Sequence, residues 1–428
     1  MKHLTCIPIL LLAIVHLSCA QPYPGGNWKK TTQTGKTINK NNLVVILPGA
    51  FNTGKYFTLL TGKRVGLFAN HTATIGSKHL VDSLTGAGIK VTKIFGPEHG
   101  FRGTADAGEK VESYIDKQTG IPVVSLYGKK RKPSAADLAD VDVMVFDIQD
   151  VGVRFYTFIS SLQDFIESAI EHNKPLIVLD RPNPNGFYVD GPILDTAFKS
   201  FIGMQPIPIV YGMTIGEYAQ MLLGEKWLSP QANAKAAITL ANANSGGFTL
   251  TVIPCTNYVH TSKYQLPQIP SPNLKQMQSI YLYSSTCFFE GTVLSEGRGT
   301  DQPFQVFGHP VYPTTMYAFT PKPNDGAKSS KCFYQQCYGW NLGGTVNEVL
   351  QKVEGQIQLK YLLEAYRLFP GKDTFFLKNN FFNKLAGNSV LMTQVKQGLS
   401  ETDIRQSWQP GLLRFKAIRK KYLLYKDF

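Results

Sequence analysis

The sequence lacks the short motifs by which several common enzyme classes are recognised. Its first predicted strand leads to PGAFNTG at 48–54 rather than to GxGxxG, and no turn carries the P-loop pattern. No GxSxG elbow occurs either, which argues against serine-hydrolase chemistry of that type. We therefore expect no nucleotide and no other cofactor.

Cysteine is also scarce, with six in 428 residues and no CxxC pair, so a zinc ribbon is not expected. Four cysteines lie beyond the N-terminal segment: Cys255, Cys287, Cys332 and Cys337. In an oxidising compartment Cys332 and Cys337 could close a small loop as a disulfide. The alternative is four independent buried thiols, and the sequence leaves both open.

Long hydrophobic runs are missing, because the apolar stretch at 7–15 is too short to span a bilayer. It follows a basic MKH start and precedes SCA at 18–20, the pattern of a secretory signal over residues 1–20. Cleavage after Ala20 would release a soluble protein, whereas lipidation of Cys19 would make a lipoprotein. His16 stands where an aliphatic residue is usual for lipidation, and both routes stay open. We expect an exported protein, in the periplasm or on the outer membrane through lipidated Cys19.

Acidic residues are outnumbered, since 44 Lys and Arg face 30 Asp and Glu and leave a net charge of +14. A basic surface favours binding to nucleic acid, to an anionic membrane or to an acidic polysaccharide. Export makes nucleic acid a poor partner and leaves lipids or the wall polymer. Residues 21–42 have no acidic residue and are rich in Gly, Thr, Asn and Lys, which is typical of a linker.

A regular α/β pattern follows the linker. Apolar runs at 44–47, 64–69, 90–95, 122–126, 142–146 and 175–179 predict buried strands, and helical patterns lie at 77–86, 135–140 and 155–171. This alternation predicts a mainly parallel, Rossmann-like sheet domain over 43–285. Residues 286–428 are expected to form a smaller α+β domain, with a helical pattern at 346–369 and strand-like segments at 389–395 and 412–415.

Polar turns follow four of the predicted strands, and in a parallel sheet they meet at the carboxyl edge, where such folds bind ligands. The candidate residues in these turns are Asn70, His71, Glu98, His99, Asp147, Asp150, Arg154, Tyr156, Asp180, Arg181 and Asn183. Their convergence predicts an active-site crevice at this edge.

Glu98 is the leading candidate for a general acid. It lies in GPEHG at 96–100, where proline and glycines frame a tight turn that presents Glu98 beside His99. A hydrogen-bonded turn carboxylate is the alternative. Asp147 and Asp150 precede a predicted helix, and capping that helix is an equally simple role for them.

Arginines at the same edge are natural ligands for a substrate carboxylate, because guanidinium binds carboxylate through two hydrogen bonds. Arg154 and Arg181 fit this role, although either could pair with Asp150 or Asp180 instead. A metal site could in principle use His71, His99, Glu98 and Asp180. Their spacing matches no known metal-ligand pattern, so we expect no metal.

The second domain contributes two loops dense in glycine and charge, FFEGT at 288–292 and SEGRGT at 295–300. We expect the second loop to form a wall of the pocket. Within it, Glu296 is the leading candidate for a second catalytic carboxylate, with Asp150 in reserve, and Arg298 is a candidate substrate ligand. If neither carboxylate serves, the alternatives are a mechanism that uses groups of the substrate itself or a tyrosine such as Tyr156. An ordinary surface loop is the alternative.

Taken together, the motifs resemble one enzyme family. GPEHG at 96–100, DIQDVGVRFYTF at 147–158, DRPNPNG at 180–186, and EGT with SEGRGT within 290–300 are similar to the NamZ family of exo-β-N-acetylmuramidases, formerly a domain of unknown function. The resemblance runs from about residue 63 to near the C-terminus. It implies a Rossmann-like domain, a smaller C-terminal domain and a cleft between them, with Glu98 as the catalytic residue.

The activity that the resemblance implies is release of terminal, non-reducing N-acetylmuramic acid from peptidoglycan fragments such as the muramic-acid–glucosamine disaccharide. The lactyl carboxylate of that sugar suits an arginine-lined cleft, and glycoside hydrolysis usually uses two carboxyl groups. Two other readings stay open: a non-catalytic protein that binds muropeptides, which would not need Glu98, and a hydrolase of sugar amides or esters.

Overall fold

The computed structural model describes residues 35–39, 42–102, 112–241 and 247–428. The predicted signal at 1–20, with Cys19, and most of the predicted linker lie outside these residues. Residues 35–39, at the end of that linker, form strand β1 (Gly35–Asn39), which pairs antiparallel with β2 (Asn42–Ile46). Among the helices that are described, none combines the length and the hydrophobicity needed to cross a membrane.

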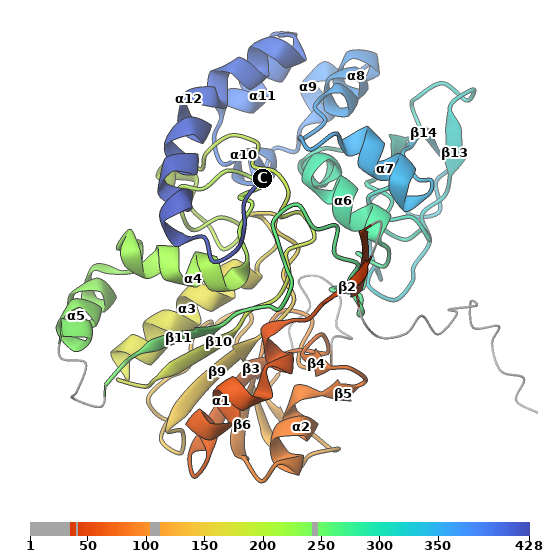
Figure 1. Ribbon diagram of the computed structural model, residues 1–428. Helices are drawn as coiled ribbons and strands as arrows, with labels where there is room; N and C mark the ends of the chain where they lie inside the picture. Colours follow the sequence, from red (N-terminus) through yellow and green to blue (C-terminus); the bar gives the residue numbers. More distant parts are fainter. Residues whose placement is uncertain (1–34, 40–41, 103–111, 242–246) are drawn as a thin grey trace, which may run out of the picture. The chain divides into compact units, whose positions relative to one another are not determined.

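A seven-stranded sheet with the order β11-β10-β9-β3-β6-β8-β7 is the centre of the first domain (Figure 1). Neighbouring strands run parallel except at one edge, where β7 is antiparallel to β8. The strands are β3 (Arg64–Ala69), β6 (Lys90–Gly96), β7 (Tyr114–Ile115), β8 (Pro122–Ser125), β9 (Val143–Asp147), β10 (Leu176–Leu179) and β11 (Leu250–Ile253). The predicted α/β class and its mainly parallel sheet are confirmed. The predicted strand at 44–47 overlaps β2 and lies outside this sheet.

Both faces of the sheet are covered, which explains the continuous apolar runs. In β9 every residue is buried, and successive side chains enter opposite layers. Val143 and Val145 join a cluster with the helices of one face, whereas Met144 and Phe146 join the larger cluster on the other.

The first face is covered by α1 (Thr53–Leu60) and α2 (Leu80–Gly86), and the second by α3 (Phe158–Glu171) with α4 (Ile215–Gly224) and α5 (Pro230–Ala241) against it (Figure 1). Shorter elements lie between them: η1 (Gly49–Phe51), η2 (Thr196–Phe198), and the hairpin of β4 (Thr74–Ile75) and β5 (Lys78–His79). The helix predicted at 77–86 starts at Leu80. The one predicted at 135–140 is wrong, because those residues form turns.

Helix α3 begins three residues later than its apolar pattern predicts. Thr157 occupies the N-cap position, and the two aromatic residues before it are buried outside the helix. Phe155 packs edge-on against Tyr283 and near Phe288 of the second domain. Its hydrophobicity therefore belongs to the contact between the domains, although its spacing matches the helix.

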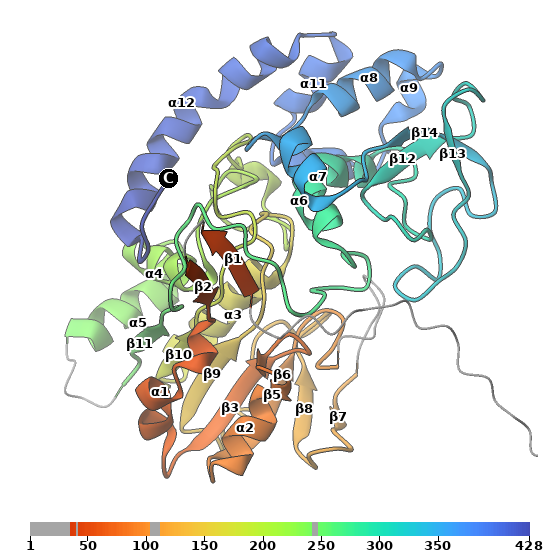
Figure 2. The same cartoon turned by 45° about the vertical axis from the view of Figure 1, so that its right-hand side comes forward.

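Helix α6 (Met277–Thr286) spans the predicted boundary at 285/286, and it is followed by η3 (Cys287–Gly291) and a small antiparallel sheet in the order β12-β14-β13. Its strands are β12 (Val306–His309), β13 (Tyr317–Phe319) and β14 (Cys337–Asn341). The rest of the second domain is helical (Figure 2). Its helices are α7 (Val346–Val353), α8 (Lys360–Leu368), α9 (Lys372–Phe375), α10 (Phe381–Ala386), α11 (Val390–Lys396), α12 (Glu401–Arg419) and η4 (Lys420–Tyr422). A smaller α+β second domain is thus confirmed.

Both strand-like segments predicted near the C-terminus are wrong, because 389–395 lies mostly in α11 and 412–415 lies within α12. The buried side chains of α12 include Ile404, Trp408, Leu412 and Phe415, which fall on one face at helical spacing. A window of four residues is too short to distinguish this period from that of a strand. The pattern at 346–369 forms two helices, separated where Glu354 and Gly355 have positive φ.

The described cysteines, Cys255, Cys287, Cys332 and Cys337, are all free. A disulfide between Cys332 and Cys337 is therefore not formed in this structure. The neighbouring Cys337 side chain nevertheless lowers the pKa of the Cys332 thiol.

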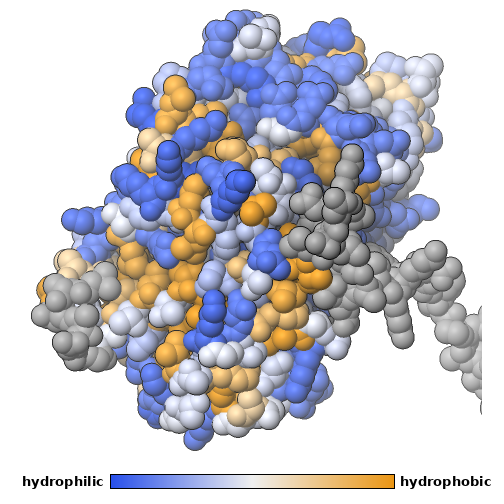
Figure 3. Space-filling view, in the orientation of Figure 1, coloured by the Kyte–Doolittle hydropathy of each residue, from blue (hydrophilic) through white to orange (hydrophobic). Residues whose placement is uncertain are grey.

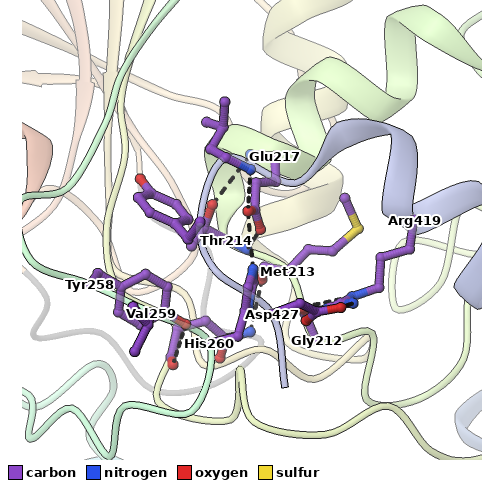
Figure 4. A network of polar contacts seen from close by, with 12 residues as sticks. Gly212, Met213, Thr214, Glu217, Tyr258, Val259, His260, Arg419 and Asp427 are labelled. Carbon is purple, nitrogen blue, oxygen red and sulfur yellow. Dashed lines mark hydrogen bonds and ion pairs between the residues drawn. The ribbon is translucent and has the colours of Figure 1, made fainter.

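The C-terminal segment returns to the sheet domain through a polar network (Figure 4). Arg419 donates to the carbonyl of Gly212 and forms two hydrogen bonds with Asp427. Glu217, which is fully buried, caps α4 with Thr214 and accepts hydrogen bonds from His260 and from the backbone of residue 424. The network ties the end of the chain to the start of α4.

Candidate active site

A pocket of roughly 460 Å³ opens at the carboxyl edge of the sheet, between the sheet domain and the second domain. This volume lies in the range of small-molecule sites. Polar side chains from both domains line it, among them Glu98, His99, Tyr127, Arg131, Thr157, Asn273, Glu290 and Arg298. Aromatic side chains surround them: Phe155, Tyr156, Phe158, Phe201, Tyr283, Phe304 and Phe381. The predicted crevice at the sheet edge is therefore present, and the second domain forms its other wall.

Glu98 lines this pocket directly after β6, and its carboxylate accepts hydrogen bonds from the hydroxyls of two described residues. The hydroxyl of Tyr127 donates to Oε1 at 3.0 Å, and the hydroxyl of Thr157 donates to Oε2 at 3.0 Å. Burial and the adjacent Glu98 carboxylate raise the pKa of Tyr127, so its hydroxyl keeps its proton and remains a donor. Tyr127 follows β8 and Thr157 occupies the N-cap position of α3, so residues beside three separate elements fix the position of this carboxylate.

The GPEHG turn has the tight geometry that its sequence predicts. Gly100 donates to the carbonyl of Pro97, and both His99 and Gly100 have positive φ, at 67° and 75°. A non-glycine residue in this region is uncommon and costs conformational energy. His99 is buried and lines the pocket beside Glu98, as expected.

The second carboxylate of the pocket is Glu290 in η3. Its Oε1 lies 2.6 Å from Nη2 of Arg298, which also lines the pocket. Glu296 lies behind this pair: it is buried, contacts Arg298 at 3.3 Å and Lys331 at 2.8 Å, and does not line the pocket. Burial would raise the pKa of Glu296, but the charges of Lys331 and Arg298 outweigh it and lower the pKa. Glu296 thus supports Arg298, and the prediction that it faces the pocket is wrong.

Arg154 is not available to a substrate. Its guanidinium is fully buried and donates to four backbone carbonyls, those of Pro192, Ile207, Leu385 and Ala386. Burial lowers its pKa to about 9. The last two carbonyls belong to α10, so Arg154 joins the two domains, and its predicted role as a substrate ligand is wrong.

Arg181 is likewise engaged inside the protein. It is 2 % exposed and binds Asp147 through two hydrogen bonds of 2.5 and 2.9 Å. Asp147 therefore pairs with an arginine rather than capping α3. Because both groups are buried against each other, the prediction that Arg181 binds a substrate carboxylate is wrong.

Asp150 and Asp180 are also buried away from the pocket. Asp150 accepts hydrogen bonds from Tyr211 and from the backbone of Gly152, and burial raises its pKa to about 7. Asp180 accepts from Thr214 and Tyr425, and burial raises its pKa to about 7 as well. Neither lines the pocket, so neither is placed to contact a ligand there.

The remaining edge residues divide in the same way. Asn70 and Asn183 are buried and hydrogen-bond within their turns. His71 contacts the carbonyl of residue 269, and burial lowers its pKa. None of these three lines the pocket. Tyr156 does line it, with its hydroxyl donating to the carbonyl of Pro270 at 2.8 Å.

Sequence reasoning missed several pocket residues. Glu290 stands in a quoted motif, EGT, but was not singled out. Arg131 lies in the basic run KKRK at 129–132, which resembles an ordinary solvated surface. In the structure Arg131 stacks on Phe201, 4.1 Å from the ring centroid, and no carboxylate among the described residues pairs with it. Within the same described part of the chain, no three His, Cys, Asp or Glu residues are grouped to hold a metal ion.

Comparison with known proteins agrees with this architecture. The model of the exo-β-N-acetylmuramidase NamZ N-terminal domain matches residues 65–278, and that of the NamZ C-terminal domain matches residues 281–425. The peptidoglycan β-N-acetylmuramidase NamZ of Bacillus subtilis (strain 168) is 39% identical over 388 residues, which cover 86% of this chain and 89% of that protein.

Two crystal structures of DUF1343 family proteins from Bacteroides fragilis NCTC 9343 have the same fold. One is 43% identical with a TM-score of 0.79 and covers 90% of this chain and 99% of its own. The other is 28% identical with a TM-score of 0.71 and covers 89% and 99%. Both family models and the relative together span most of the chain, and the chain therefore belongs to the NamZ family.

Proposed function

We propose that this protein is an exo-acting glycoside hydrolase that releases terminal, non-reducing N-acetylmuramic acid from peptidoglycan fragments. One observation carries the proposal: in a chain of the NamZ family, the GPEHG glutamate, Glu98, lies in the pocket between the domains. The hydroxyls of Tyr127 and Thr157 hold its carboxyl group in place.

Within this proposal Glu98 is the general acid that protonates the glycosidic oxygen, and Glu290 is the second carboxyl group. Arg298 positions Glu290 at 2.6 Å, while Glu296 and Lys331 position Arg298 from behind. The half-buried aromatic side chains of the pocket, Phe201 and Phe381, would pack against the apolar faces of the sugar ring.

The test is incubation with the muramic-acid–glucosamine disaccharide and identification of the products by mass. We expect free N-acetylmuramic acid from the wild type, and a loss of turnover of roughly a hundredfold or more in Glu98→Gln and in Glu290→Gln. Both changes remove a carboxyl group and keep its shape. Thermal unfolding of each variant checks that the fold is intact.

Three outcomes would contradict the proposal. Near-normal turnover of Glu98→Gln would show that Glu98 is not the general acid. Release of acetate instead of the sugar would indicate an amide or ester hydrolase. Binding without turnover in the wild type would indicate a muropeptide-binding protein.

We further propose that residues 1–20 direct export, and that the mature chain begins either at Cys19 with a lipid or after Ala20 without one. The support is the basic, apolar and small-residue order of this segment. The mass of the mature N-terminal peptide distinguishes the two routes. A peptide that retains Met1 would contradict both.

A further inference from the structure

Lys331 lies behind the wall of the pocket, next to three oxygen atoms of the protein. Its ammonium group donates to the backbone carbonyls of Phe289 at 2.6 Å and Thr292 at 3.0 Å, and it lies 2.8 Å from a carboxylate oxygen of Glu296. An ammonium group carries three protons, so these three oxygens match its donors in number. The lysine therefore serves contacts inside the protein.

Its burial distinguishes Lys331 from most other lysines of the second domain. Figure 3 shows mainly hydrophilic residues over the helices at the top of this view, and most lysines of the domain are exposed to solvent. The Lys331 side chain is only 25 % exposed. Removing a charged group from water costs free energy unless protein partners replace the water, so the position of Lys331 depends on these three oxygens.

The two carbonyls lie on either side of Glu290. Within η3 (Cys287–Gly291), Phe289 directly precedes Glu290, and Thr292 is the residue that follows the helix. Carbonyl groups at the C-terminal end of a helix attract lysine side chains. Lys331 thereby anchors the backbone before and after the second carboxyl group of the pocket.

Lys331 also ends a chain of alternating charges that begins in the pocket. Glu290 lies 2.6 Å from Arg298, and Arg298 lies 3.3 Å from Glu296, which contacts Lys331 in turn. Two negative and two positive charges therefore balance along the chain. Together with η3, the chain closes a ring of contacts that holds Glu290 by its backbone and by its carboxylate.

The charge of Lys331 determines how Arg298 divides between its two carboxylates. Burial raises the pKa of Glu296, but the charges of Lys331 and Arg298 outweigh it, so the buried carboxylate is ionised and needs both cations. Without Lys331, Arg298 would be its remaining cationic partner among the described residues. Attraction would then draw the guanidinium towards Glu296 and lengthen its 2.6 Å contact with Glu290.

We propose that Lys331 is a positioning residue for Glu290. It anchors the η3 backbone on both sides of Glu290 and neutralises Glu296, so that Arg298 holds the Glu290 carboxylate at the pocket. Lys331 does not line the pocket, and it acts through these neighbours. Its effect on turnover rests on the proposed function, in which Glu290 is the second carboxyl group.

The experiment measures kcat and KM for the muramic-acid–glucosamine disaccharide. Lys331→Met removes the ammonium group and keeps a long side chain. We expect kcat to fall roughly tenfold or more, with KM within about threefold of the wild type, because Glu290 shifts while the other pocket side chains stay. The matched control is Lys322→Met, which removes an exposed lysine whose backbone hydrogen-bonds to Gly299 in the adjoining loop, and it should behave as the wild type.

A second substitution separates charge balance from a purely structural contact. Glu296→Gln removes the charge that competes for Arg298, so its combination with Lys331→Met should raise kcat at least about fivefold above that of Lys331→Met alone. A purely structural role predicts a further loss instead, since two contacts are then missing. The same pair of measurements with Lys331→Gln decides the question if Lys331→Met does not fold.

A crystal structure of Lys331→Gln gives a readout that does not depend on turnover. Arg298 should approach Glu296 and lose its 2.6 Å contact with Glu290. An unchanged contact would overturn the proposal, as would wild-type kcat in Lys331→Met, a further loss in the double variant or an equal loss in Lys322→Met. Failure of the proposed function would appear separately, as absence of disaccharide cleavage by the wild type, and the crystal structure would then still decide the role of Lys331.

Discussion

Arg131 is the cation at the pocket that is best placed to select a muramic-acid sugar. It lines the pocket, stacks on Phe201 and is exposed, whereas Arg298 is already paired with Glu290 and Glu296. We expect Arg131→Gln to lower kcat/KM for the muramic-acid substrate by roughly tenfold or more, the value of a charge-assisted hydrogen bond.

The measurement compares that substrate with an N-acetylglucosaminide analogue that lacks the lactyl group. The analogue should be affected little, and Lys129→Gln, a nearby exposed charge that does not line the pocket, should affect neither. An equal loss on both substrates would show that Arg131 does not recognise the lactyl carboxylate.

Asp150 makes the stability of the protein depend on pH. Burial raises its pKa from 3.8 to about 7, so folding favours the protonated carboxyl group. Its contribution to stability is fully present below pH 4 and is lost as the pH rises towards 7, because the unfolded chain ionises first. Asp180 has the same raised pKa and adds a slope of the same sign.

We therefore expect Asp150→Asn to flatten part of the fall in the free energy of unfolding between about pH 4 and 7, leaving the shares of Asp180 and of Asp164, whose pKa burial raises to about 6. The amide keeps an acceptor for Tyr211 and Gly152, so the fold should survive. Chemical denaturation at several pH values measures the slope. An unchanged slope would show that folding does not raise the pKa of Asp150.

At the scale of the elements, the turn after β9 determines where α3 begins and therefore where Thr157 lies. Gly152 in this turn has a φ of 76°, and a Cβ atom there would overlap the side-chain amide of Asn183 in the turn after β10. Two adjacent sheet-edge turns are thus in contact only because residue 152 is glycine.

We expect Gly152→Ala to destabilise the protein by about 2 kcal/mol or more through strain and overlap, and to lower turnover as Thr157 shifts. Gly54→Ala is the matched control, because it lies exposed in α1 and its Cβ would meet no atom within 4 Å. That change should be neutral or slightly stabilising. Equal unfolding temperatures for both variants would contradict this account of the turn.

At the scale of the whole described chain, residues 34–428 form one compact unit. The C-terminal segment contributes contacts that hold this unit together. The hydroxyl of Tyr425 donates to Asp180 at 2.5 Å and accepts from the backbone of Cys255 at 2.8 Å. These contacts join the last residues of the second domain to the turn after β10.

We expect Tyr425→Phe to lower the free energy of unfolding by about 1–3 kcal/mol, because two buried groups lose their partner. Lys426→Ala, an exposed neighbour, should change it by less than about 0.5 kcal/mol. Denaturant titration measures both. A loss no larger in Tyr425→Phe than in Lys426→Ala would show that the C-terminal contact contributes little.

Much of the fold and part of the site were determined by the sequence itself. The strand at 64–69 has the predicted bounds, because a strand buried on both faces leaves a continuous apolar run that no surface element shares. Glu98 and His99 could be placed in the pocket because the GPEHG turn directly follows such a strand. The family, too, was readable from four ordered motifs.

Tertiary structure decided which polar residues of that edge reach the pocket. In sequence Arg154 follows a predicted strand and Arg131 lies in a basic run, yet the second domain covers Arg154 with the carbonyls of α10 and leaves Arg131 exposed beside Phe201. Glu290 and Glu296 are six residues apart in similar glycine-rich segments. Arg298 pairs with both, but Glu290 lines the pocket whereas Glu296 is buried behind Arg298. Local sequence determines which edge of the sheet a residue lies on. Whether its charge faces a ligand or a buried partner depends on chain segments far away in sequence, which no local pattern specifies.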